Sequence, residues 1–308
     1  MRRFVLLHAG IALALASSPF PVRAQAGGAV MAISVETLAG RVRVLRGYAN
    51  GNILALPTTA GTLLVDGQST KRVAEADSVL RAAGMGDVRW VVTTHYHGDH
   101  LEGNAHWRAI GAQVFAHANV RAQAAKDTTI VELGWHRTTA DAASLPTTQV
   151  GDSTRLVLGR DTVYLLHAPR AHTDGDLVVW MPRRNLLHAG DIVELGAFPF
   201  LDWWSGGTLD GMIAAVDRIL AMANDETIII PGHGPSATRR RVAEYRAMLT
   251  TVRERVGASV RAGKTVDEVL AAAPLADFAA TNGGEGAARR FAWLVYYDLS
   301  HSQKRANR

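Results

Sequence analysis

The chain has 308 residues, of which 48% are hydrophobic and 20% charged, with twelve histidines, no cysteine and a formal charge of +5. The missing cysteine excludes a disulfide scaffold, a thiol nucleophile, an iron-sulfur cluster and any zinc site with a cysteine ligand. The length is enough for one large domain with an ample core, or for two ordinary ones.

The first 24 residues have the features of a secretory signal peptide. Two arginines precede an apolar stretch from Phe4 to Ala16, and small residues near position 25 allow cleavage after Ala24 or Ala26. The apolar stretch is too short to span about 30 Å of hydrocarbon. We therefore predict that residues 1–24 are removed and that the mature protein is periplasmic or secreted, without a membrane span.

The charge balance of the mature chain bears on its partners. The leader carries three arginines and no acid, so its removal lowers the formal charge from +5 to +2. A nearly neutral protein has no basic field to attract nucleic acid, which leaves a small molecule as the expected partner. The sequence carries no signal for an oligomeric state.

After the leader, short β-prone runs alternate with helical patterns. Strands are expected at residues 35–38, 42–45, 52–56 and 62–65, then a helix at 69–83 and a strand at 90–94. A second set of strands is expected at 114–116, 155–158, 162–167, 177–181, 185–188 and 227–230, with a helix at 209–223 before the last. Helices at 237–256, 266–272 and 286–299 follow. The pattern predicts an α/β layered domain at residues 30–240 and a helical C-terminal extension, residues 241–308, packed on it.

The run from His95 to His100 holds three imidazoles and one carboxylate in six positions. Because an extended backbone points alternate side chains the same way, His95 and His97 can converge on one ion, while Asp99 and His100 turn toward a second. A hydrophobic core does not explain four polar groups so close together, since each would need a buried partner. Imidazole and carboxylate without thiolate suit Zn²⁺, with iron or manganese as alternatives.

Two metal ions need more ligands than this run supplies. Three later residues, His172, Asp191 and His233, each lie where an expected strand meets a loop. Glycines precede Asp191 and flank His233, and glycine allows the close backbone approach of a crowded metal centre. These three residues are therefore the further candidate ligands.

Taken in order, these motifs resemble those of the metallo-β-lactamase superfamily of metallohydrolases, over roughly residues 35–240. The resemblance implies a four-layer αββα sandwich with the metals at one edge, between the two sheets. It also implies one metal held by His95, His97 and His172, a second held by Asp99, His100 and His233, and a bridging Asp191. By the same resemblance Asp66 holds ligands in place, and His188 is close enough to Asp191 for a similar supporting role.

The resemblance implies a hydrolase with two zinc ions per chain. Such a pair activates a bridging water, and the resulting hydroxide attacks the carbonyl of an ester, lactone, thioester or amide, with Asp99 as the catalytic residue that orients it. The acid at position 191 resembles the bridging arrangement of glyoxalase II and the lactonases. The alternatives are a β-lactamase without a cysteine ligand, a mononuclear iron dioxygenase, and a metal-containing binding protein without enzymatic activity.

An aromatic loop follows Asp191, with four aromatic residues in the seven positions from Phe198 to Trp204. Such a loop can line a substrate pocket beside the metals, and the alternative is a structural plug packed on the core. The residues predicted to contact substrate are Phe200, Trp203, Trp204 and Tyr96. Trp135 and Arg170 are weaker candidates, and Arg170 is suited to a substrate carboxylate.

Overall fold

The computed structural model describes residues 32–47 and 50–306. The predicted signal peptide, residues 1–24, lies outside the described residues and stays a prediction. Among the helices of the described residues, none combines the length and the apolar character that a membrane crossing requires.

The first half of the chain builds a seven-stranded sheet. In spatial order its strands are β1 (Ser34–Thr37), β2 (Arg43–Arg46), β3 (Asn52–Thr58), β4 (Gly61–Val65), β5 (Val88–Val92), β6 (Gln113–His117) and β9 (Thr148–Val150). The strands from β1 to β4 pair antiparallel, as the predicted meander requires, and β4, β5, β6 and β9 pair parallel. The parallel strands therefore end at one edge, where the histidine run follows β5.

The second half builds a five-stranded sheet. Its strands are β10 (Ser153–Leu158), β11 (Asp161–His167), β12 (Leu177–Met181), β13 (Leu186–His188) and β14 (Ile228–Ile230), antiparallel except for the parallel pair of β13 and β14. A separate hairpin of β7 (Thr128–Ile130) and β8 (Trp135–Arg137) was not predicted from the sequence. Its strands have three residues each, too few for a clear alternation of polar and apolar positions.

The helices are α1 (Val73–Ala82), α2 (Gly98–Leu101), α3 (Asn104–Ala109), α4 (Ala118–Ala124), α5 (Leu209–Met222), α6 (Arg239–Arg261), α7 (Val266–Ala271), α8 (Ala276–Ala279) and α9 (Gly284–Ala306). The five helices predicted from periodicity are present. Helix α1 begins four residues later than predicted, because residues 69–72 form a turn in front of it. The helices α2, α3, α4 and α8 were missed. Each has four to seven residues and gives little helical periodicity, although the six-residue α7 was predicted.

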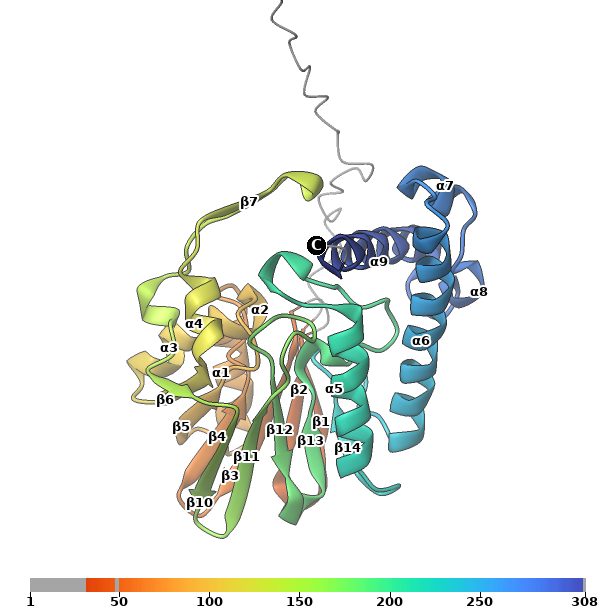
Figure 1. Cartoon of the computed structure of the whole chain (residues 1–308). Coiled ribbons are helices and arrows are strands. Elements are labelled where there is room, and N and C mark those ends of the chain that lie inside the picture. The colour runs from red at the N-terminus through yellow and green to blue at the C-terminus, as the bar shows by residue number, and fades with distance from the viewer. Residues whose placement is uncertain (1–31, 48–49, 307–308) are drawn as a thin grey trace, which may run out of the picture.

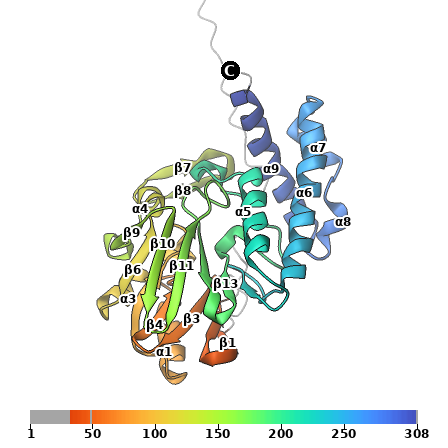
Figure 2. The ribbon, with the colours of Figure 1, turned by 60° about the horizontal axis from the view of Figure 1, so that its bottom comes forward.

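Three hydrophobic clusters hold these elements in four layers (Figures 1 and 2). Leu54 and Val65 of the first sheet pack with Val179 of the second between the two sheets. On the outer side of the first sheet lie α1 and α3, with Leu80 and Trp107 buried against it; on the outer side of the second lie α5, α6 and α9. The predicted αββα sandwich is confirmed, and its C-terminal helices share one cluster with α5.

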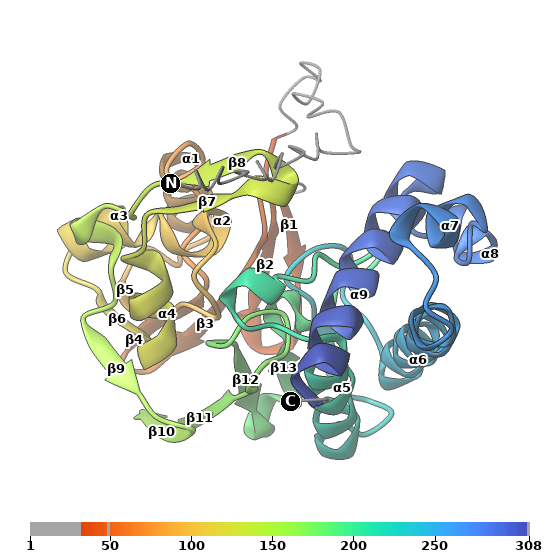
Figure 3. The same ribbon diagram turned by 45° about the horizontal axis from the view of Figure 1, so that its top comes forward.

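Figure 3 looks down on one end of the sandwich, with the β7–β8 hairpin on one side and α9 on the other. The turns after β5, β11, β13 and β14 contain the candidate ligands. Residues that are far apart in the sequence thus meet because four strands end near the same edge.

Candidate metal centre

The seven candidate ligands lie together in two adjoining groups. His95, His97, His172 and Asp191 form the first group, and Asp99, His100 and His233 the second; within each group the ligand atoms lie within 4.8 Å of one another. Each of the two groups contains residues from both halves of the chain. The tertiary fold therefore places every one of these side chains where the sequence analysis expected a metal centre, and their role as ligands stays a prediction.

The spacing of the first group suits a metal ion. Nδ1 of His97 lies 3.1 Å from Nε2 of His95 and 3.0 Å from Nε2 of His172. Zinc binds histidine nitrogens at about 2.0–2.1 Å, so two ligands of a tetrahedral site are roughly 3.3 Å apart. Small shifts of the rings would accommodate one ion among the three nitrogens.

The hydrogen bonds of the same rings indicate which nitrogens face the cluster. His172 donates from Nδ1 to the carbonyl oxygen of Phe200 at 2.6 Å, and His97 donates from Nε2 to Asp202 at 3.0 Å. In the neutral rings, His172 Nε2 and His97 Nδ1 therefore carry lone pairs that face each other at 3.0 Å. Burial, followed by the charge of His97, lowers the pKa of His172 to about 4. A metal ion among these nitrogens would relieve this repulsion.

The second group combines two imidazoles with carboxylates. His100 donates from Nδ1 to Asp66 at 2.8 Å, which turns Nε2 toward Asp99 at 3.4 Å. His233 Nε2 lies 3.2 Å from the same carboxylate. Burial raises the pKa of Asp99, but the neighbouring His100 outweighs it and holds that pKa well below its usual range. The group therefore presents an ionised carboxylate, the form that binds metal.

Asp191 joins the two groups. Its Oδ2 lies 3.6 Å from His95 Nε2, 3.7 Å from His172 Nε2 and 3.5 Å from His233 Nε2. Its buried Oδ1 lies 3.3 Å from His100 Nε2 but forms no hydrogen bond within the described residues. Burial raises the pKa of Asp191, and the surrounding histidines, His100 first, outweigh it and hold that pKa well below its usual range. A buried, ionised carboxylate without a hydrogen-bond donor for Oδ1 fits a metal ligand between two ions.

The backbone around Asp191 leaves room only for glycine. A Cβ at Gly232 would lie 1.9 Å from Asp191 Oδ1, and Gly190 has φ +52°, a conformation that side chains disfavour. The two glycines let the turns after β13 and β14 approach each other, and Gly232 donates its N–H to the Gly190 carbonyl at 2.7 Å.

Asp66 and His188, the two predicted supporting residues, lie beside the ligands. Asp66 accepts hydrogen bonds from His100 and from both the backbone and the hydroxyl of Thr94, the residue before His95. His188 accepts at Nδ1 from the N–H of Gly190, next to Asp191. Asp66 has φ +69°, and aspartate tolerates this left-handed conformation better than most residues.

The buried His188 is expected to make the stability of the folded protein depend on pH. Burial lowers its pKa from 6.5 to about 4, so the unfolded chain binds a proton between these values that the folded protein does not. This component of stability is complete above pH 6.5 and is lost as the pH falls toward 4. From pH 7 to pH 5 it amounts to about 2 kcal/mol of the free energy of unfolding. Urea unfolding at both pH values measures it.

The control is His188→Asn, whose Oδ1 keeps the acceptor for Gly190 but does not titrate. Between pH 7 and pH 5, the free energy of unfolding of the variant is expected to fall by about 2 kcal/mol less than that of the wild type. Equal losses in the two proteins would show that His188 is not the group responsible.

Asp202, which was not predicted from the sequence, lies beside the first group. This buried carboxylate accepts hydrogen bonds from Tyr96 Oη and His97 Nε2 at one oxygen, and from the N–H of Ser205 at the other. Burial raises the pKa of Asp202, but its hydrogen bond with His97 outweighs it and holds the pKa below its usual range. Asp202 thus fixes the ring of His97 with Nδ1 toward the cluster. The available signal was an acid inside an aromatic run, since a buried carboxylate requires donors.

Substitution of Asp202 by asparagine is expected to weaken metal binding at the first group by about 10- to 100-fold, because residues that orient ligands typically have effects of this size. Tyr96→Phe is the matched control: it removes the other donor to the same oxygen and leaves the bond of His97 in place. We expect Tyr96→Phe to change the metal affinity of the first group by less than about threefold. Competition with a chromogenic chelator measures both affinities, and equal effects would contradict the orienting role.

The predicted substrate-binding aromatics fall into two sets. Phe200 lines a cavity of about 440 Å³ next to the first group, and the buried Tyr96 lines one of about 340 Å³ together with His97. Trp203 and Trp204 stack on each other with centroids 4.0 Å apart and lie against Tyr297 and Trp293 of α9. The two tryptophans therefore connect the aromatic loop to the C-terminal helices, and their contact with substrate stays a prediction.

Of the weaker candidates, Trp135 lines the same cavity as Phe200. Arg170 is exposed, and neither of these two cavities includes it.

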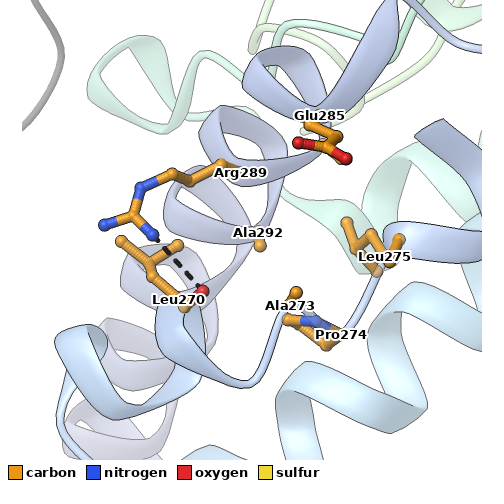
Figure 4. A pocket seen from close by; sticks show the side chains of 9 residues that line it. Leu270, Ala273, Pro274, Leu275, Glu285, Arg289 and Ala292 are labelled. Carbon is orange, nitrogen blue, oxygen red and sulfur yellow. Dashed lines mark hydrogen bonds between the residues drawn. The ribbon is translucent and has the colours of Figure 1, made fainter.

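A third cluster, His117, Asp152 and His167, is less suited to a metal. The two rings stack at 3.7 Å with an angle of 9° between their planes. An imidazole lone pair lies in the ring plane, and two parallel planes cannot both contain one ion. A further cavity of about 280 Å³ among α7, α8 and α9 has Leu270, Glu285 and Arg289 in its wall but none of the candidate ligands (Figure 4).

The sequence model of the metallo-beta-lactamase superfamily matches residues 49–233, which include all seven clustered residues. The chain belongs to this superfamily. It is accordingly a metal-dependent hydrolase.

Individual relatives within the superfamily are distant. Metallo-beta-lactamase type 2 of Bacillus cereus is 24% identical over 199 residues, 63% of this chain and 72% of that protein. The protein of the same name from Bacillus sp. (strain 170) is 24% identical over 194 residues, 61% of this chain and 70% of that protein.

Solved structures support the fold. A metallo-beta-lactamase from Pontibacter korlensis aligns with a TM-score of 0.59 at 17% identity, covering 71% of this chain and 99% of that one. The metallo-beta-lactamase FIM-1 from Pseudomonas aeruginosa, solved in a mono-zinc form, aligns with a TM-score of 0.54 at 22% identity, covering 71% and 95%.

Proposed function

We propose that this protein is a dinuclear zinc hydrolase that cleaves an ester, lactone, thioester or amide. The observation that carries the proposal is the position of Asp191, whose Oδ2 lies within 3.7 Å of histidine nitrogens from both groups. His95, His97 and His172 would hold one ion and Asp99, His100 and His233 the other, with Asp191 shared. Two such ions would activate water as a nucleophile and polarise the carbonyl of the substrate.

The residues of the chain provide proton transfer and orientation. In hydrolysis the water oxygen bonds to the carbonyl carbon, and the bond from that carbon to the leaving oxygen, sulfur or nitrogen breaks. Asp99 is the group suited to accept the proton of the water and to pass it to the leaving group, because its carboxylate is ionised and its side chain is 26% exposed. The other carboxylate of the cluster, Asp191, has a side chain only 8% exposed.

The test is element analysis of the purified mature protein, with the same sample assayed on esters, lactones, thioesters and β-lactams. We expect two zinc ions per chain and turnover of a substrate from the first three classes. One iron and no zinc would indicate a dioxygenase instead. Two ions per chain without any hydrolysis would contradict the proposed reaction.

A second candidate is β-lactam hydrolysis, which the names of the relatives favour. Turnover of nitrocefin distinguishes it from the first. Nitrocefin turnover with a kcat/KM well above that of every ester, lactone and thioester would favour the β-lactamase.

We also propose that the mature protein is exported, because residues 1–24 have the layout of a secretory leader. N-terminal sequencing of protein from the periplasm or medium is expected to begin at Gln25 or Gly27. Mature protein retained in the cytoplasm with its first residues intact would contradict export.

A further inference from the structure

The 440 Å³ cavity beside the metal centre has a wall built by the C-terminal extension. Its lining residues are Trp135, Glu194, Phe198, Pro199, Phe200, Gly286, Ala287, Arg290, Phe291 and Leu294. The last five belong to α9, which lies outside residues 49–233. The cavity therefore combines residues of the aromatic loop, of the β7–β8 hairpin and of a helix that the superfamily match does not include.

The cavity adjoins both groups of the metal centre. The ring of Phe200 lies 5.9 Å from the ring of His97 and 6.2 Å from that of His172, between centroids, and its carbonyl oxygen accepts the hydrogen bond of His172. On the other side, Glu194 forms a parallel β-bridge with His233. A molecule in the cavity would therefore contact Phe200, whose ring lies beside those of His97 and His172.

Arg290 places a positive charge in this mostly apolar cavity. Its guanidinium lies 5.3 Å from the ring centroid of Trp135 and 5.4 Å from that of Phe200, so two aromatic rings hold it in place. Burial lowers the pKa of Arg290, and the charge of Glu194 offsets part of this effect. Within the described part of the chain the guanidinium has no hydrogen bond or ion pair, and Glu194, the one acid in the lining, does not approach it within 4.0 Å.

A partly buried guanidinium offers five N–H donors in a fork that matches a carboxylate. The wall around it contains the buried side chains of Phe198, Phe291 and Leu294, and Trp135, which is 39% exposed, lies in the same lining. The lining thus combines apolar side chains with one cationic group, Arg290, and one acid, Glu194, and the guanidinium is suited to the anionic end of an amphiphilic ligand.

We propose that this cavity binds the acyl side of the substrate and that Arg290 selects substrates with a carboxylate at the far end of an apolar chain. The inference rests on the proposed hydrolase function and extends it to the substrate class. It also gives α9 a role in specificity, since Arg290 and half of the lining come from this helix.

The test compares two esters of equal acyl length, mono-4-nitrophenyl glutarate and 4-nitrophenyl valerate, on the zinc-loaded enzyme. The wild type is expected to prefer the anionic glutarate ester. Arg290→Gln should lower kcat/KM for that ester by about 10- to 100-fold, mainly through KM, and change the neutral ester by less than about threefold. Arg290→Lys keeps the positive charge but lacks the forked arrangement of donors. Its kcat/KM for the anionic ester should lie between those of the wild type and of Arg290→Gln.

The matched control is Arg289→Gln on the same helix, whose guanidinium donates to the Leu270 carbonyl in the other cavity (Figure 4). It is expected to behave as the wild type on both esters. Equal loss on both esters in Arg290→Gln, or a wild-type preference for the neutral ester, would overturn the inference.

If neither ester is hydrolysed, the proposed hydrolase function fails on these substrates, and a binding measurement still tests the cavity. Calorimetry with 4-phenylbutyrate is expected to show binding to the wild type and to Arg289→Gln, and at least about tenfold weaker binding to Arg290→Gln. No binding to the wild type, or unchanged affinity in Arg290→Gln, would overturn the role of the cavity.

Discussion

If the centre holds two ions as proposed, replacing Asp191 with alanine is expected to leave one firmly bound metal ion per chain and to lower hydrolysis by at least about 100-fold. The reason is electrostatic: two cations held a few ångströms apart repel each other, and the ionised carboxylate between the two groups offsets this repulsion. The ion that remains should be that of the first group, because His95 and His172 are fully buried there, whereas Asp99 and His233 of the second are in part open to water.

Element analysis after dialysis against a weak chelator measures the stoichiometry. Asp225→Ala, at an exposed acid in the loop before β14, is the control and should retain both ions. Two ions per chain in Asp191→Ala, bound as tightly as in the wild type, would rule out the bridging role of Asp191.

A second large effect, a loss of catalytic rate, is expected for Asp99→Asn. Asparagine keeps an oxygen near His100 and His233 but loses the negative charge and the ability to accept a proton. If Asp99 transfers the proton of the attacking water, kcat should fall by about 100- to 10,000-fold while KM changes little. The first group should keep its ion, since Asp99 belongs to the second.

Steady-state kinetics and element analysis on the same sample separate catalysis from metal loss. Glu102→Gln is a matched control one helical turn away, because this exposed carboxylate contacts Thr70 and no candidate ligand. A variant Asp99→Asn with wild-type kcat and both ions present would show that another group moves the proton.

Local patterns were sufficient for most of the fold and for the candidate ligands. The β-branched runs and apolar periodicity predicted the strands of both sheets except β9, together with helices α1, α5, α6, α7 and α9, because these signals come from residues close in the sequence. The run from His95 to His100 carried the metal prediction because so many imidazoles and carboxylates in six positions have no explanation in a hydrophobic core. His172, Asp191 and His233 were found because each follows a strand and two of them stand beside glycine.

The contacts that tune the site depend on residues far apart in the sequence. Asp202 meets His97 from 105 positions away, and Arg290 meets Trp135 across 155, so no local pattern linked them. The ring nitrogen that a histidine turns toward the cluster is determined by the hydrogen bond that its other nitrogen makes. His172 makes this bond to the carbonyl of Phe200, and His97 makes it to Asp202. Short motifs thus indicated the type of chemistry and, through the family resemblance, a bridging position for Asp191. The histidine tautomers and the wall that α9 adds to the cavity followed only from the packing of distant segments.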